Sequence, residues 1–148
     1  MADKLILSGT LRLSELGKRR KTAQMFSKLI NENTNVFRRH FGVGLFPGSL
    51  NIDVPEPSDL QKQLDSGEPK PSFVIPRNEL VGMPDYIGDG QAWRCKLECG
   101  KIPDPVDCWI FRRIGSRVPA AVIEILAQEQ LVCSYQLRDG DPVSLRVL

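Results

Sequence analysis

A short segment, Phe46-Pro47-Gly48-Ser49-Leu50-Asn51, holds the side chains best suited to bind a metal ion. The Pro-Gly pair predicts a turn, and the residues after it predict a strand over 49–54. On a strand, Ser49 and Asn51 point to the same face, because successive side chains alternate. A hydroxyl and an amide oxygen on one face suit a Mg²⁺ ion that also binds phosphate. The alternative interpretation is a turn followed by two solvated polar side chains.

A run of cations after the first expected strand could bind phosphate. Gly17 is followed by Lys18, Arg19, Arg20 and Lys21. Backbone N–H groups near a glycine, together with side-chain charge, can cradle phosphate oxygens. A solvated charged surface has the same composition, so the residues alone leave both interpretations open.

Glu124 interrupts an apolar stretch, residues 122–127. A carboxylate in such surroundings either reaches the rim of the core or is placed to meet a polar ligand. The flanking residues 120–131 follow a helical or mixed period. Glu124 is therefore a candidate for ligand contact, and its pattern favours a helical or mixed element.

The elements that must position these residues are mostly short strands. Alternation and strand-forming residues predict strands over 5–13, 49–54, 73–76, 93–99 and 106–114. A helix is expected within 22–41, broken near 31–35, and Asn33 or Thr34 could cap a second short helix over 35–41. The turn Asp139-Gly140 before alternating Val143, Leu145 and Val147 predicts a closing hairpin. Many short strands with few helices favour a mainly β fold, a compact barrel.

Length and composition narrow the class of protein. The chain has 148 residues, which fits one domain over 1–148. Its hydrophobic content of 41 % and charged content of 26 % are ordinary for a soluble protein. The net charge of +2 argues against nucleic acid as a partner. No apolar run approaches the roughly 18 residues of a membrane span, and no signal segment opens the chain, so a cytoplasmic location is expected.

The cysteines and the single histidine offer little chemistry by spacing. Cys95, Cys99, Cys108 and Cys133 form no C-x-x-C pair, so we expect reduced, buried thiols and no thiolate metal site. His40 follows two arginines, and a cation at a helix C-terminus explains it better than a catalytic base. No residue is identified as a general base.

Taken together and in order, three segments resemble the archaeal-type CTP-dependent riboflavin kinases. They are Phe41-Gly42 through Asn51, Ser116 through Ala127, and Leu137-Arg138-Asp139-Gly140-Asp141-Pro142-Val143. The resemblance covers nearly the whole chain. It implies a small six-stranded Greek-key barrel of the cradle-loop type with a few short helices. It also implies transfer of the terminal phosphate of a nucleoside triphosphate, CTP in this family, to riboflavin, which gives FMN.

The resemblance assigns a role to each candidate segment. It implies Mg²⁺ binding at Ser49 and Asn51, and flavin contacts at Ser116 and Glu124. It implies nucleotide contacts from the loop that holds Gly17, Lys18 and Arg19. It implies further nucleotide contacts from residues 129–132, which are Glu129, Gln130, Leu131 and Val132.

Two other interpretations remain open on the sequence. The family loop carries alternating glycines and this chain keeps Gly17 alone, which favours a non-catalytic flavin- or nucleotide-binding module on the same barrel. The Asp-Gly-Asp ending also resembles swapped-hairpin transcription-factor barrels. Together with the cations at 18–21, that ending would suit a DNA-binding regulator.

Overall fold

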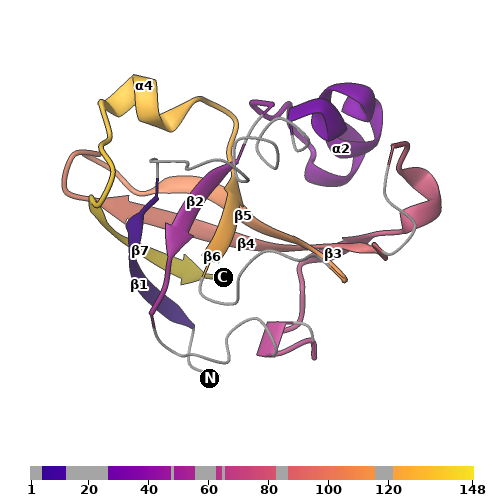
Figure 1. The fold of residues 1–148 in the computed structure, drawn as a ribbon, viewed down its shortest axis with the longest axis horizontal. Coiled ribbons are helices and arrows are strands. Elements are labelled where there is room, and N and C mark those ends of the chain that lie inside the picture. The colour runs from indigo at the N-terminus through magenta and orange to yellow at the C-terminus, as the bar shows by residue number, and fades with distance from the viewer. Residues whose placement is uncertain are drawn as a thin grey trace.

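A closed β-barrel forms the centre of the protein. The computed structural model describes residues 5–12, 27–47, 49–55, 63–64, 66–82, 87–115 and 122–148. Within these residues the strands are β1 (Ile6–Leu11), β2 (Leu50–Asp53), β3 (Phe73–Ile75), β4 (Gly90–Cys99), β5 (Val106–Arg113), β6 (Val122–Leu126) and β7 (Pro142–Val147). All pairings are antiparallel, and the order β4-β5-β6-β2-β1-β7 returns to β4. The expected six-stranded barrel is confirmed, with β3 added as a short edge strand beside β4 (Figure 1).

Alternate residues of the six barrel strands fill the interior. Because side chains alternate along a strand, each strand sends every second residue inward. The inward residues include Leu7, Ile52, Trp93, Ile110 and Leu145, each no more than 2 % exposed. These apolar side chains stabilise the barrel by burial and leave the polar residues between them on the outer face.

A helix covers part of the outer face of the barrel. Residues 27–32 are helical, and α2 (Thr34–Phe41) follows after one turn residue, close to the break that the sequence predicts. Phe37 and Phe41 of α2 pack against Phe111, and the Phe41 ring meets Trp109 edge-on at 5.3 Å. In the described residues, no helix is long and apolar enough to cross a membrane.

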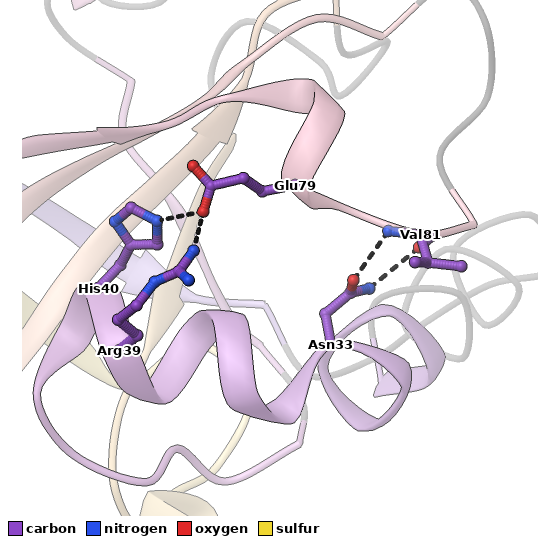
Figure 2. Close-up of polar contacts among 5 residues, drawn as sticks. All are labelled: Asn33, Arg39, His40, Glu79 and Val81. Carbon is purple, nitrogen blue, oxygen red and sulfur yellow. Dashed lines mark hydrogen bonds and ion pairs between the residues drawn. The ribbon is translucent and has the colours of Figure 1, made fainter.

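Two groups of polar contacts, drawn in Figure 2, hold α2 and the preceding Asn33 against the short helix η1 (Arg77–Glu79) and the residues after it. Asn33 was a predicted cap, but its buried side chain makes no capping bond. Instead its Oδ1 accepts from Val81 N at 2.8 Å and its Nδ2 donates to Val81 O at 3.0 Å. Glu79 contacts Arg39 and, at 3.0 Å, the Nε2 atom of His40. The hydrogen bond with His40 is the main cause that lowers the pKa of Glu79.

The C-terminal third differs from the sequence prediction in two elements. Within the stretch 120–131, for which the sequence favours a helical or mixed element, residues 122–126 form strand β6, and helix α4 (Leu131–Tyr135) begins only at the end of that stretch. The predicted closing hairpin is wrong, because β7 pairs with β1 and β4 and not with the segment just before it. The turn at Asp139 and Gly140 instead leads from the α4 region into β7.

The four cysteines are free thiols, as predicted, although they are not all buried. Cys95 and Cys108 lie opposite each other on β4 and β5 inside the barrel, and Cys133 is exposed on α4. A hydrogen bond with Cys95, followed by burial, raises the pKa of Cys108 well above its ordinary value. Cys95 and Cys108 therefore behave as core residues.

Candidate functional site

Asn51 and Glu124 lie side by side on the outer face of the barrel. They are direct partners across the β2–β6 ladder. Their chain neighbours Leu50, Ile52, Ile123 and Ile125 belong to the barrel core, so the two polar side chains point outward. Both are half-buried. The structure thus brings a predicted metal ligand next to a predicted flavin contact.

Ser49 immediately precedes β2 and lies two residues before Asn51 in the sequence. It borders a small cavity of about 50 Å³. The other residues that line this cavity are Phe46, Leu50, Ile125, Ala127, Glu129, Gln130, Leu131 and Val132. The predicted metal ligand Ser49 and all four residues of the predicted nucleotide segment 129–132 therefore meet at one cavity.

The side chains of segment 129–132 are largely engaged with α4. The Oε1 atom of Gln130 accepts from Cys133 N at 2.6 Å and caps the helix. Glu129 accepts from the hydroxyls of Ser134 and Tyr135, each at 3.4 Å. The Glu129 charge is the main cause that raises the pKa of Tyr135. Leu131 is buried in the barrel core, and Val132 packs against that core from the cavity wall.

Asp53 continues the polar row on β2 and is held by a cation. Its Oδ2 atom lies 2.5 Å from the Nε atom of Arg12. Arg12 also donates its backbone N–H to the Asn51 carbonyl at 3.0 Å. The chain therefore lies beside Asn51 where it leaves β1, six residues before the run of cations at 18–21 in the sequence.

Four predicted site residues lie outside the described residues. They are Gly17, Lys18, Arg19 and Ser116. The structure describes residues on either side of them in the sequence. Arg12, before Gly17, is hydrogen-bonded to Asn51, and Val122, after Ser116, pairs with Asp53 on β2.

A larger cavity, which the sequence did not reveal, lies beside α2. Its volume is about 300 Å³. Its lining combines the rings of His40, Phe41, Phe73 and Trp109 with the charged residues Arg94 and Asp107. Lys96 lies 2.6 Å from Asp107, and the hydrogen bond with Lys96 is the main cause that lowers the pKa of Asp107. None of the predicted site residues lines this cavity, which depends on contacts between α2 and the barrel that a residue pattern does not specify.

Phe46 also lines a cavity and received no role in the sequence analysis. It lines the small cavity and is 38 % exposed. Its backbone N–H donates to Ala127 O at 2.9 Å, which fixes it beside the end of β6. In Figure 1 the chain enters β2 between α4 and α2. The sequence signal that could have identified Phe46 was its position as an aromatic residue within the segment 46–51, which was predicted to bind a metal ion.

The outer-face site offers oxygen ligands of the kind that Mg²⁺ prefers. They are the hydroxyl of Ser49 and the amide oxygen of Asn51. No cluster of three or more histidine, cysteine, aspartate or glutamate side chains occurs within the part of the chain that the structure describes. Mg²⁺ commonly takes one or two protein ligands and completes its shell with phosphate and water. The donor set therefore fits this ion.

Fold and site together define a β-barrel domain with a polar site on its outer face. The family model for CTP-dependent riboflavin kinases, described as domain of unknown function DUF120, matches residues 21–147. A curated riboflavin kinase from Methanospirillum hungatei JF-1 is 32 % identical over 112 residues, which cover 75 % of this chain and 46 % of that protein. The chain thus spans about half the length of this relative. It belongs to the CTP-dependent riboflavin kinase family.

Proposed function

We propose that the protein is a riboflavin kinase that phosphorylates riboflavin to FMN with a nucleoside triphosphate, CTP by family membership. The observation that carries the proposal is the order of groups along β2 and β6. The cavity beside segment 129–132 comes first, Ser49 lies at its border, and the Asn51–Glu124 pair follows two residues further along the chain. Direct phosphoryl transfer needs the phosphates of the donor, together with their metal, next to the acceptor hydroxyl, and this order puts the proposed metal ligands beside both binding segments.

In this proposal the nucleotide lies at the cavity with its phosphates directed toward Ser49. The Ser49 hydroxyl and the Asn51 amide oxygen hold Mg²⁺ against the phosphates. The ion supplies charge neutralisation on the transferring phosphoryl group. The residues Lys18 and Arg19, which follow Arg12 in the sequence, add positive charge, and Gly17 allows close backbone approach. That contribution falls as salt rises, because the cations act through screened charge.

Riboflavin occupies the far end of the row. Glu124 and Ser116 hold it, with the Glu124 carboxylate accepting hydrogen bonds from the ligand. The 5′-hydroxyl oxygen of the ribityl chain then bonds to the terminal phosphorus, and the bond from that phosphorus to the bridging oxygen breaks. The hydroxyl proton is lost and a nucleoside diphosphate leaves. Positioning and charge supply most of the catalysis in such a transfer.

The flavin half of the proposal is tested by riboflavin binding, measured by quenching of flavin fluorescence. Glu124→Gln keeps the size of the side chain and removes its charge, and Glu124→Ala removes its hydrogen bonds as well. We expect affinity to fall by about tenfold in each variant, because a hydrogen bond to a charged group contributes about 1.5–3 kcal/mol. Glu98→Gln is the matched control, since Glu98 is exposed on β4 and paired with Arg146. Unchanged affinity in both Glu124 variants would remove Glu124 from the flavin site.

A further inference from the structure

We propose that the ring of Phe46 is the stacking surface for the base of the bound nucleotide. This inference rests on the proposed function and extends it, since it names a residue that sets how the nucleotide is recognised. The ring is 38 % exposed, unlike most large apolar side chains of the protein, and it borders the cavity shared by Ser49 and segment 129–132.

The size of the cavity places the base on its rim. A pocket that encloses a drug-sized ligand usually has about 300–1,000 Å³. The cavity beside Phe46 has about 50 Å³, which is too small to enclose a nucleobase. A base that approaches this cavity must therefore lie against its border, and Phe46 is the aromatic ring among the described residues that form that border.

The backbone around Phe46 is already fixed for this role. Its N–H donates to Ala127 O at 2.9 Å, so the segment before β2 is tied to the end of β6. A surface that is ordered before binding loses less conformational entropy when the ligand arrives. The ring thus offers a flat face at little cost, and stacking on an aromatic ring contributes about 1–3 kcal/mol per base.

Two of the three polar side chains that line the cavity have other partners. Gln130 uses its Oε1 atom to cap α4, and Glu129 accepts hydrogen bonds from Ser134 and Tyr135. Few fixed groups are therefore left on this border to read the edge of a base. Stacking tolerates all four bases, because every base has a π face. Loss of the ring should therefore weaken the binding of all four nucleoside triphosphates by a similar factor.

The isoalloxazine ring of riboflavin is the competing occupant. Glu124 lies three residues before Ala127, the residue that anchors Phe46. Because a strand rises about 3.3 Å per residue, this spacing separates Glu124 from the anchor of Phe46 by about 10 Å along the chain. Phe46 instead shares its cavity with the segment that the family assigns to the nucleotide. The position of the ring therefore favours the base over the flavin.

Calorimetric titration of the wild type and of Phe46→Leu and Phe46→Tyr tests the inference. The ligands are CTP, UTP, ATP and GTP, with tripolyphosphate as a probe that has no base and riboflavin as a probe that has no phosphate. We expect Phe46→Leu to weaken all four nucleotides by about tenfold, since 1.4 kcal/mol corresponds to a factor of ten. Affinities for tripolyphosphate and riboflavin stay at the wild-type values, and Phe46→Tyr binds nucleotides normally.

Four results would overturn the inference. Wild-type nucleotide affinity in Phe46→Leu removes the stacking role and leaves the kinase proposal standing. A loss of riboflavin affinity assigns the ring to the flavin. An equal loss for tripolyphosphate shows that the variant disturbs the phosphate site. If the wild type binds no nucleotide at all, the proposed function fails together with the inference, so the two failures are distinguishable.

Discussion

Asn51→Ala is expected to lower the rate of riboflavin phosphorylation by about 100-fold or more, the effect typical of losing one group that stabilises the developing charge. The amide oxygen of Asn51 is a proposed metal ligand and lies opposite Glu124 on the β2–β6 ladder. The variant should still fold, because one half-buried hydrogen-bonding group contributes about 0.5–1.5 kcal/mol to stability. The measurements are FMN formation at saturating Mg²⁺ and the free energy of unfolding in urea.

Two further variants make the Asn51 result specific. Asn51→Asp keeps an oxygen ligand and should recover part of the activity, with a changed dependence on Mg²⁺ concentration. Asn35→Ala removes an exposed asparagine from α2 and should phosphorylate riboflavin like the wild type. Full turnover in Asn51→Ala would show that Asn51 does not hold the metal.

The largest effect on stability is expected for Gly9→Ala on β1. A Cβ atom at this position would lie 2.2 Å from the Asp53 carbonyl oxygen and 3.0 Å from Ile52 Cγ2. Because backbone cannot move aside without separating β1 from β2, we expect a loss of about 3 kcal/mol or more. The same displacement shifts the strand that carries Asn51, so turnover should fall with stability.

Gly100→Ala is the matched control for Gly9→Ala. Gly100 lies in the turn between β4 and β5, where an added Cβ meets nothing within 4 Å. Its unfolding free energy should change by less than about 1 kcal/mol, in either direction. If urea unfolding gives the same stability for both variants, the close contact between β1 and β2 does not exist in solution.

The strands of the barrel were largely predictable from alternation, whereas their partners were not. Val143, Leu145 and Val147 predict a strand because every second residue is apolar, and all three face the core. The partners of β7 are β1, from the start of the chain, and β4. A local turn pattern carries no information about such distant pairing, and for this reason the predicted hairpin was wrong.

Strand β6 was missed as a strand because both of its faces are partly covered. Ile123 and Ile125 face the barrel core, while Leu126 packs in the aromatic cluster under α2. A strand that is buried on both sides loses its alternation and is easily taken for a helical pattern. Glu124 is the polar residue within this strand, and it lies opposite another polar residue, Asn51 of β2.

The local half of the candidate site followed from the sequence, and the rest depends on tertiary structure. Two residues spaced by two on a strand must share a face, so Ser49 and Asn51 were predictable as a pair. The contact between Asn51 and Glu124 depends on the register of β2 against β6. The position of Phe46 depends on a backbone bond to Ala127. Neither register nor such a bond is encoded in a short motif.

Riboflavin phosphorylation by the purified protein tests the central claim most directly. Riboflavin and Mg²⁺ are incubated with CTP, ATP, GTP or UTP in parallel, and FMN is separated from riboflavin and quantified by its fluorescence. The proposed function predicts FMN with at least one nucleotide, CTP included, together with an equal amount of the matching nucleoside diphosphate, and none when Mg²⁺ is chelated. Riboflavin binding without FMN formation from any of the four nucleotides would contradict it and identify the barrel as a flavin-binding module.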